Sequence, residues 1–403
     1  MRKLYPSLFL LIIFAVAQCS PSFAISEPKT RKKSASSRAA VRHSSAKAKR
    51  IKPAKKRVVA KAKRQYLMPR NSASRNSFVA GGPWKEPTFA DSSLGDVIDG
   101  EDLMIRRAAV DALGPYNGSV VVADPQNGRI LTIVNQKLAL GSGFQPCSTV
   151  KIVTALAGLK EGVIERDTML RLGRKSSINL TEALARSNNP FFAKVGVDLG
   201  FEKVHSYAQM LGLGERAGLN IEGEFPGVLP SAPPKFGGVG MMTSFGEGIQ
   251  LTALQLASLL SAVSNGGTLY HLQYPRTKAE IESFVPRVKR HLNIHDEIPN
   301  VKPGMMAAVE YGTARRAQYD PNEPILGKTG TCTDRATPTH LGWFGSFNEV
   351  GHNKLVVVVL LTGGRPVNGP VAAQVAGNVY RNLSSQQFFA GEPRVSTAGV
   401  SSN

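Results

Sequence analysis

The chain has 403 residues, of which 42% are hydrophobic, and a chain of this size can bury one large core or two small ones. Its 50 Lys and Arg against 29 Asp and Glu give a formal net charge of +21, but eighteen of the basic residues and a single acid, Glu27, lie in residues 25–75. The remainder is nearly neutral, so the charge of the whole chain gives no reason to expect a polyanion-binding surface on its folded part.

The first 24 residues have the features of a secretory signal peptide. Arg2 and Lys3 supply the positive start, residues 8–17 form a short apolar run, and residues 22–24 (Ser-Phe-Ala) suit cleavage. The apolar run is shorter than the roughly 20 residues that a membrane-spanning helix needs, which argues against an uncleaved anchor. We therefore expect an exported protein, periplasmic or otherwise extracytoplasmic, from which residues 1–24 are removed.

Residues 25–93 are expected to form a basic, disordered tail and linker. The tail is rich in Lys, Arg, Ala and Ser, and so few apolar side chains cannot bury enough surface to fold alone. Because the chain is expected to be exported, this charge suits an anionic membrane or wall polymer, and no nucleic acid is expected as a partner. The folded domain is placed at residues 94–390, and the polar residues 391–403 are expected to be a second disordered tail.

Helical and strand patterns alternate along the predicted domain. Apolar residues recur at helical spacing in residues 102–113. Two β-branched runs, 119–123 and 129–134, flank the turn sequence Asp-Pro-Gln-Asn-Gly, which predicts a hairpin. A long helical middle follows, with helices predicted at residues 148–160, 178–195 with a break allowed at Pro190, 203–211 and 251–264.

Strand patterns return toward the C-terminal end. Residues 324–332, 340–347 and 355–362 predict three strands, the last two joined as a hairpin, and residues 370–383 predict an amphipathic helix. This order predicts an α+β fold. One antiparallel sheet is built from both ends of the chain and flanked by helices, and a helical subdomain is inserted between the two sets of strands.

Ser148 and Lys151 are the first candidate pair for chemistry. Positions i and i+3 share one face of a helix, so the Lys amine can reach the Ser hydroxyl. A hydroxyl becomes a strong nucleophile only when a base takes its proton, and a Lys can be that base when burial and a nearby cation lower its pKa. The spacing alone is not specific, because Ser44 and Lys47 match it in the basic tail and a lone Ser at a helix start is more often an N-cap.

Two further short motifs follow. Ser187 and Asn189 (Ser-Asn-Asn) end a helical run, where a hydroxyl and an amide can relay a proton and hold a substrate carbonyl. Lys328, Thr329 and Gly330 lie on a predicted strand, where Lys and Thr can bind a carboxylate and Gly allows close approach of a substrate backbone. Each motif alone is weak: the first pattern also occurs in the linker, and the second is as short as an ordinary turn at a strand edge.

The ordered set is far more specific than its members. A Ser with Lys at i+3, then Ser-x-Asn, then Lys-Thr-Gly is the signature of penicillin-binding proteins and serine β-lactamases, and this chain resembles that superfamily. The surroundings are similar to transpeptidase motifs as well: FQPCSTVKIVTALAGLKEGVI at 144–164, LTEALARSNNPFF at 180–192 and GKTGT at 327–331. SFGEGIQLTALQL at 244–256 resembles a stretch typical of transpeptidase domains rather than of β-lactamases.

The resemblance implies a substrate and a role for each motif residue. The substrate is a D-alanyl-D-alanine stem peptide of peptidoglycan, β-lactams bind covalently, and no cofactor is required. The implied nucleophile is Ser148 with Lys151 as its base, and Ser187 relays a proton to the leaving amine while Lys328 sets the local potential. The other implied contacts are Asn189 to a substrate amide, Thr329, Gly330 and Thr331 to the substrate's C-terminal end, and an oxyanion hole from the backbone N–H groups of Ser148 and Thr331. An amine resolves the acyl-enzyme in a transpeptidase, and water resolves it in a carboxypeptidase.

Cys147 and Cys332 remain after removal of the signal peptide. An even number of cysteines in an oxidising compartment favours a disulfide. In the implied fold the Lys-Thr-Gly strand runs beside the start of the nucleophile helix, so both cysteines border one pocket. Some carbapenem-hydrolysing serine β-lactamases bridge these two positions. The alternative is two unpaired, partly buried thiols.

Departures from the family leave the physiological role open. Related transpeptidases usually carry a glycosyltransferase or a large non-catalytic module, and this chain has the basic tail and linker instead, so a separate glycosyltransferase is a candidate partner. Glu247 stands where relatives often have Gln, and Cys147 where they often have Gly. The alternative functions are a β-lactamase, although no E-x-x-L-N motif is found, and a non-catalytic β-lactam-binding sensor or scaffold. The seven His are scattered, so no metal site is predicted.

Overall fold

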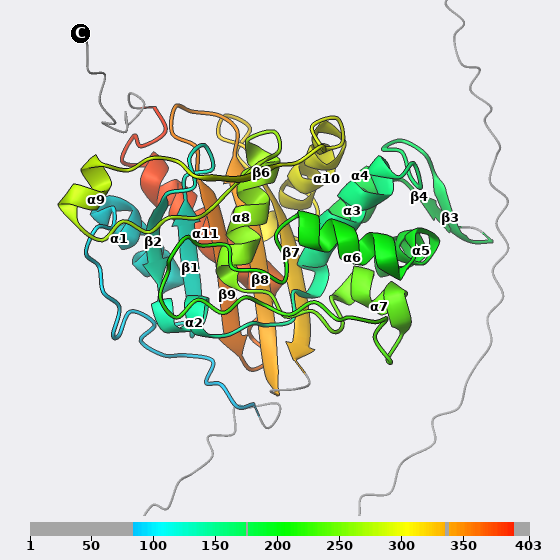
Figure 1. Ribbon diagram of the computed structural model, residues 1–403, viewed down its shortest axis with the longest axis horizontal. Helices are drawn as coiled ribbons and strands as arrows, with labels where there is room; N and C mark the ends of the chain where they lie inside the picture. The colour runs from blue at the N-terminus through cyan, green and yellow to red at the C-terminus, as the bar shows by residue number, and fades with distance from the viewer. Residues whose placement is uncertain (1–83, 175, 335–337, 391–403) are drawn as a thin grey trace, which may run out of the picture. The chain divides into compact units, whose positions relative to one another are not determined.

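The computed structural model describes residues 84–174, 176–334 and 338–390 (Figure 1). The predicted signal peptide, the basic tail, most of the linker and the C-terminal tail lie outside these residues. The described helices and strands are α1 (Leu103–Leu113), β1 (Gly118–Ala123), β2 (Ile130–Val134), α2 (Gln136–Gly141), the 3₁₀ helix η1 (Cys147–Val150), α3 (Lys151–Lys160), β3 (Leu170–Gly173), β4 (Ser176–Ile178), α4 (Leu180–Ala185), α5 (Asn189–Leu199), α6 (Phe201–Met210), α7 (Gly238–Phe245), α8 (Ala253–Ser264), β5 (Thr268–Tyr270), α9 (Lys278–Glu282), β6 (Val288–His291), α10 (Ile298–Glu310), the 3₁₀ helix η2 (Arg315–Ala317), β7 (Ile325–Asp334), β8 (Thr339–Asn348), β9 (Val356–Gly363) and α11 (Gly369–Ser384). No helix in the described ranges combines the length and apolar character that crossing a bilayer requires.

The main sheet joins the two ends of the domain, as predicted. Its strand order is β2-β1-β9-β8-β7, and every neighbouring pair is antiparallel. The first two strands come from the N-terminal side and the last three from the C-terminal side. The α+β fold predicted from the sequence is therefore confirmed, and β7, which carries Lys-Thr-Gly, lies at the edge of the sheet.

The central strand β9 shows why the sheet needs cover on both faces. All eight of its residues are buried, and side chains alternate between the two faces of a strand. Val356, Val358 and Leu360 pack into one hydrophobic cluster, and Val357, Val359 and Leu361 pack into a second. Helix α8 lies over the first face, whereas α1 and α11 lie over the second (Figure 1).

The inserted helical part lies beside β7. It is built from α3, α4, α5, α6, α7 and α10, with the hairpin β3–β4 at its outer end (Figure 1). The first eight residues of α3, from Lys151 to Gly158, are all buried, so this helix is surrounded by neighbours. A helix in that environment holds its side chains in fixed positions, which suits it to present a reactive group.

The boundaries predicted for two helices were wrong. The helix predicted at 148–160 starts as a 3₁₀ turn, and α3 begins only at Lys151. The helix predicted at 178–195 is two helices, and the break lies at residues 186–188, before Pro190, which occupies a first-turn position of α5. Pro suits that position because a backbone N–H in the first turn of a helix has no partner within the helix, so nothing is lost when proline lacks one.

The packed part of the chain also begins before residue 94, where the sequence placed its boundary. Thr88 is buried, its Oγ1 accepts a hydrogen bond from Gly364 N at 3.0 Å, and Asn117 Nδ2 donates to Pro87 O at 3.0 Å. Gly363 has φ +144° and leaves no room for a Cβ, which would lie 2.6 Å from Thr88 Cα. Residues 87–92 therefore lie against the end of the sheet and are part of the domain.

Candidate active site

The three sequence motifs lie on three elements that meet in space. Ser148 is in η1 and Lys151 begins α3, and their spacing brings Lys151 Nζ to 2.9 Å from Ser148 Oγ. Ser187 lies in the turn between α4 and α5, and Lys328 lies on β7. Ser187 Oγ lies 2.9 Å from both Lys151 Nζ and Lys328 Nζ. The four side chains thus form one connected polar cluster.

Lys151 is the centre of this cluster, and its side chain is fully buried. Its Nζ also lies 2.7 Å from Ser187 O and 2.5 Å from Asn189 Oδ1. Those two oxygens can only accept, so they match the two N–H groups of a neutral amine. The lone pair of that amine is then left for the hydrogen of a neighbouring hydroxyl, and Ser148 Oγ is within reach.

The electrostatic surroundings favour this neutral form of Lys151. Burial, and after it the positive charge of Lys328, lower the pKa of Lys151 to about 6. Burial lowers the pKa of Lys328 to about 7. At neutral pH the Lys151 amine is therefore a free base beside a hydroxyl, which is the pairing that nucleophilic catalysis by a serine requires.

The Ser-Asn-Asn turn contains a residue with an uncommon backbone conformation. Ser187 has φ +54°, the left-handed region that a non-Gly residue adopts rarely and at a cost of about 1–3 kcal/mol. The turn is held by Asn188 N donating to Ala183 O at 2.8 Å, and Asn188 Oδ1 caps α5 by accepting from Phe191 N at 2.9 Å. This conformation directs both the hydroxyl and the carbonyl of Ser187 at Lys151.

Strand β7 lies directly against the nucleophile turn. A Cβ on Gly330 would lie 2.9 Å from Pro146 O and 3.2 Å from Thr149 Cγ2, so a larger residue here would push the strand away from Ser148. A disulfide joins Cys147 to Cys332 beside this contact, with Cα atoms 5.6 Å apart. This is the pairing that the resemblance implied, and it links the residue before Ser148 to the strand that carries Thr331.

Thr329 and Thr331 of β7 have partners that the sequence did not predict. Thr329 Oγ1 lies 2.6 Å from Thr313 Oγ1, and Thr331 Oγ1 accepts a hydrogen bond from Gly369 N at 2.7 Å. Thr313 follows α10, and Gly369 begins α11. Neither residue belongs to a sequence motif, so only the fold could bring them to the site.

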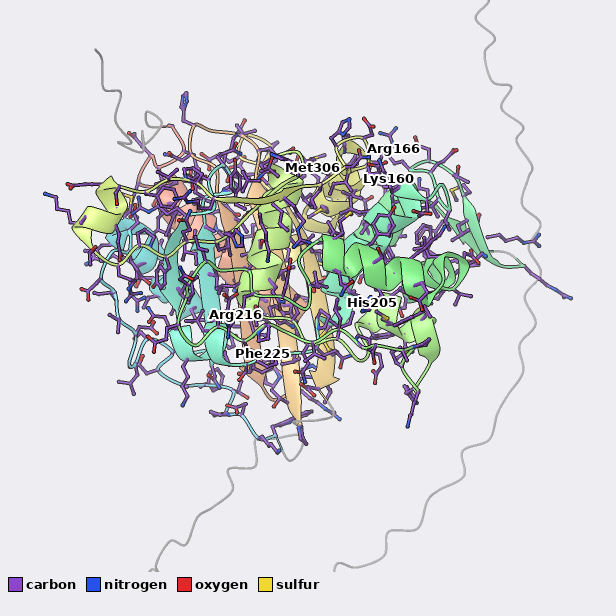
Figure 2. All side chains as sticks on the ribbon, in the orientation of Figure 1. Lys160, Arg166, His205, Arg216, Phe225 and Met306 are labelled. Carbon is purple, nitrogen blue, oxygen red and sulfur yellow. A yellow bond between two sulfur atoms is a disulfide. The ribbon has the colours of Figure 1, made fainter. Side chains whose placement is uncertain are left out.

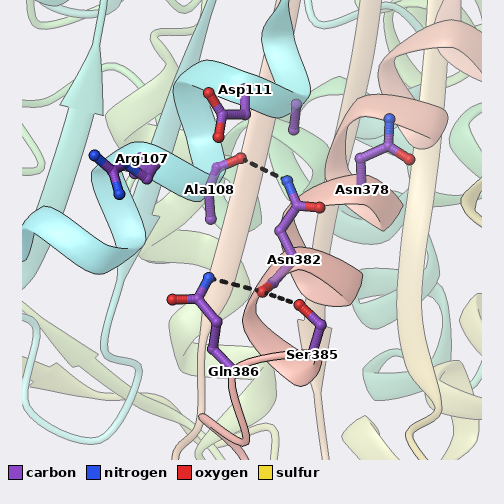
Figure 3. Close-up of a pocket in the computed structure, with 8 residues that line it drawn as sticks. Arg107, Ala108, Asp111, Asn378, Asn382, Ser385 and Gln386 are labelled. Carbon is purple, nitrogen blue, oxygen red and sulfur yellow. Dashed lines mark hydrogen bonds between the residues drawn. The ribbon is translucent and has the colours of Figure 1, made fainter.

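A hollow elsewhere on the domain lacks the groups that catalysis needs. It has a volume of about 570 Å³ and lies between α1 and α11, where Asn382 Nδ2 donates to Ala108 O (Figure 3). Its lining is polar and includes Arg107 and Asp111, but it holds no nucleophile next to a base. The Ser148 cluster therefore remains the candidate active site.

The described residues do not form a metal site either. No group of three or more His, Cys, Asp or Glu side chains in the described ranges is arranged to hold an ion. His205, the histidine labelled in Figure 2, lies on α6, where its ring stacks on Phe201 at 5.5 Å between centroids.

Known proteins resemble the chain over this same region. Residues 118–381 match the family model of the penicillin binding protein transpeptidase domain. Stage V sporulation protein D of Bacillus subtilis is 28% identical over 317 residues, which cover 66% of this chain and 49% of that protein. Peptidoglycan D,D-transpeptidase PbpA of Mycolicibacterium smegmatis is 25% identical over 330 residues, which cover 64% of this chain and 66% of that protein.

The fold is shared with a solved structure as well. The D,D-transpeptidase domain of a peptidoglycan glycosyltransferase from Eggerthella lenta aligns with a TM-score of 0.57 and 22% identity, covering 71% of this chain and 82% of that one. The chain spans about half the length of the Bacillus relative. The similarity therefore concerns the domain that holds Ser148, and not the remaining half of that relative.

Proposed function

Because this chain belongs to the penicillin-binding protein transpeptidase family, we propose that it is an exported serine acyltransferase that acts on the D-Ala-D-Ala end of peptidoglycan stem peptides. The observation that carries the proposal is the buried contact of 2.9 Å between Lys151 Nζ and Ser148 Oγ. A hydrophobic residue would fill the place of Lys151 in this apolar helix at a lower desolvation cost, so packing does not explain a Lys with a lowered pKa next to a Ser.

In the first half-reaction the neutral amine of Lys151 takes the proton of Ser148, and Ser148 Oγ attacks the carbonyl carbon of the penultimate D-Ala. The backbone N–H groups of Ser148 and Thr331 stabilise the oxyanion of the tetrahedral intermediate. The bond to the terminal D-Ala nitrogen then breaks, and the proton passes from Lys151 through Ser187 Oγ to that nitrogen. The contact of 2.9 Å between Lys151 Nζ and Ser187 Oγ supports this relay, and Lys328 Nζ, also 2.9 Å from Ser187 Oγ, holds that hydroxyl in place. The products are a Ser148 ester and free D-Ala.

Residues around the cluster hold the substrate. Asn189 Oδ1 is engaged by Lys151, which leaves its amide N–H groups to donate to a substrate carbonyl. Thr329 and Thr331 donate to the terminal carboxylate, and Gly330 lets the substrate backbone lie against β7. Lys328, whose Nζ also donates to Thr329 O at 2.9 Å, keeps the potential of the site positive when it is protonated.

In the second half-reaction the ester is resolved by one of two nucleophiles. The amine of a second stem peptide yields a cross-link and restores Ser148, whereas water yields a trimmed peptide, as in a carboxypeptidase. β-Lactams acylate Ser148 in the same way. The basic tail holds the enzyme at an anionic membrane or wall polymer, and a separate glycosyltransferase supplies the glycan strands.

The test is covalent labelling of the full chain with benzylpenicillin. We expect one adduct of the drug's mass per chain, located on the peptide that contains Ser148 and absent from Ser148→Ala. A long-lived adduct is expected of a transpeptidase, and rapid release of hydrolysed drug would indicate a β-lactamase instead. Labelling that persists in Ser148→Ala would overturn the assignment of the nucleophile.

A further inference from the structure

The hydroxyl of Thr331 is fixed by the start of helix α11. Gly369 is the first residue of that helix, and its N–H is one of the backbone donors that the helix itself leaves unsatisfied. This N–H donates to Thr331 Oγ1 at 2.7 Å. One lone pair of the Thr331 oxygen is therefore occupied, and the hydroxyl hydrogen of Thr331 must point in another direction. Because Thr331 is exposed, that hydrogen is available to a ligand.

The start of α11 lies in direct contact with the strand. A Cβ on Gly369 would lie 2.8 Å from Gly330 O, 2.9 Å from Thr329 Cβ and 3.0 Å from Thr331 Oγ1. On the neighbouring strand, a Cβ on Gly342 would lie 2.5 Å from the carbonyl oxygen of Asn368, the N-cap of α11. Glycine at both positions lets the helix terminus touch β7 and β8.

The hydroxyl of Thr329 has a partner of its own on the other side. Thr313 Oγ1 lies 2.6 Å from Thr329 Oγ1, and Thr313 is held in place by its backbone N–H, which donates to Ala185 O at 3.0 Å. Either hydroxyl of this pair can donate. When a carboxylate accepts the hydrogen of Thr329, the chain of donors runs from Thr313 through Thr329 to the carboxylate, and each bond strengthens the next.

We propose that Thr313 and the backbone N–H of Gly369 are positioning groups that orient the hydroxyls of Thr329 and Thr331 as a pair of donors toward the terminal carboxylate of the substrate. The inference rests on the proposed function, since it concerns the terminus of the same substrate. Positions i and i+2 of a strand share a face, so the two donors lie on one side of β7. A carboxylate offers both of them charged acceptors, whereas an ester offers only weak neutral ones.

The experiment compares acylation of Ser148 by benzylpenicillin and by its methyl ester. The carboxylate of benzylpenicillin stands for the free carboxylate of the peptide terminus, and the methyl ester stands for a blocked terminus. Second-order rate constants are measured by intact mass of the full chain. Thr313→Val removes the hydroxyl at nearly constant volume, and Thr313→Ser keeps it. Gly369→Ala displaces the helix terminus. The matched control is Gly141→Ala, where a Cβ would meet nothing within 4 Å.

We expect the wild type to prefer the free acid and Thr313→Val to reduce that preference about tenfold by slowing the acid alone, because Thr329 loses the hydroxyl that orients it toward the carboxylate. Thr313→Ser restores the preference, Gly369→Ala reduces it, and Gly141→Ala leaves it unchanged. Equal slowing with both probes, or an unchanged preference in Thr313→Val, would overturn the inference. If Gly369→Ala does not fold, Thr313→Val decides alone. A wild type that neither probe acylates would instead defeat the proposed function.

Discussion

The pKa of Lys151 predicts how acylation depends on pH. With a pKa of about 6, about 97% of Lys151 is neutral at pH 7.5, whereas an unperturbed lysine with a pKa of about 10.4 would be neutral only to about 0.1%. Burial and the charge of Lys328 therefore raise the amount of available base about a thousandfold, which corresponds to about 4 kcal/mol. Acidification reverses the gain: at about pH 5 only about a tenth of the lysine remains neutral.

The assay is the rate of covalent labelling by benzylpenicillin between pH 5 and 9, followed by intact mass. The rate should rise about fivefold between about pH 5 and 6 and level off above the pKa of Lys151. Lys328→Met removes the cation that contributes to the lowered pKa, so the rising limb should move to higher pH. A profile that is flat from pH 5 to 8, or a rising limb centred near the pKa of a free lysine, would refute the assignment of Lys151 as the base.

Three further predictions concern stability and location. Cys332→Ser removes a bridge between residues 185 positions apart and should lower the free energy of unfolding, measured in urea, by about 2–4 kcal/mol. A digest of the unreduced wild-type protein should contain the Cys147 peptide linked to the Cys332 peptide, and two free thiols at these positions would rule the bridge out. Arg106→Ala leaves the buried Glu101 without its ion pair of 2.9 Å and should cost about 3–5 kcal/mol in the same assay, and a loss below 1 kcal/mol would show that the pair is well replaced. Deleting residues 25–75 should abolish salt-sensitive cosedimentation with anionic vesicles while leaving penicillin labelling intact, and unchanged cosedimentation would contradict a membrane role for the tail.

The sequence was sufficient where the signal is periodic or ordered. The apolar run of β9 and the turn sequence between β1 and β2 identify their strands without tertiary information. The Ser-x-x-Lys, Ser-x-Asn and Lys-Thr-Gly order predicts which side chains must meet, and Lys151, Ser187 and Lys328 do meet. Long elements with many agreeing residues are the most predictable part of a fold.

The sequence was insufficient where tertiary contacts decide. The three-residue strands β4 and β5 and the four-residue strands β3 and β6 contain too few residues to show a period, so they were not predicted. The left-handed backbone of Ser187 has no local signature, because only glycine marks such positions reliably. Thr313 and Gly369 reach the site through the packing of α10 and α11, and a pattern read along one chain carries no information about partners so distant in sequence.

The start of the domain was also placed wrongly, because an irregular segment gives no periodic signal. Residues 87–92 contain Pro, Thr and Ser and have no strand or helix period, which is why the sequence assigned them to the linker. They are nevertheless held by hydrogen bonds to Asn117, Tyr116 and Gly364 at the end of the sheet. Composition distinguishes a foldable segment from an unfoldable one, but it does not show that an irregular segment is fixed by its neighbours.

The most direct test of the account is to trap the acyl-enzyme that a substrate peptide forms. The full chain is mixed with an N-acylated stem peptide ending in D-Ala-D-lactate, whose ester leaving group makes acylation fast, then quenched in acid and digested. The account predicts a peptide containing Ser148 that carries the mass of the substrate less D-lactic acid, and no such peptide from Lys151→Ala or Ser148→Ala. An adduct on another residue, or release of D-lactate by Ser148→Ala at the wild-type rate, would contradict it.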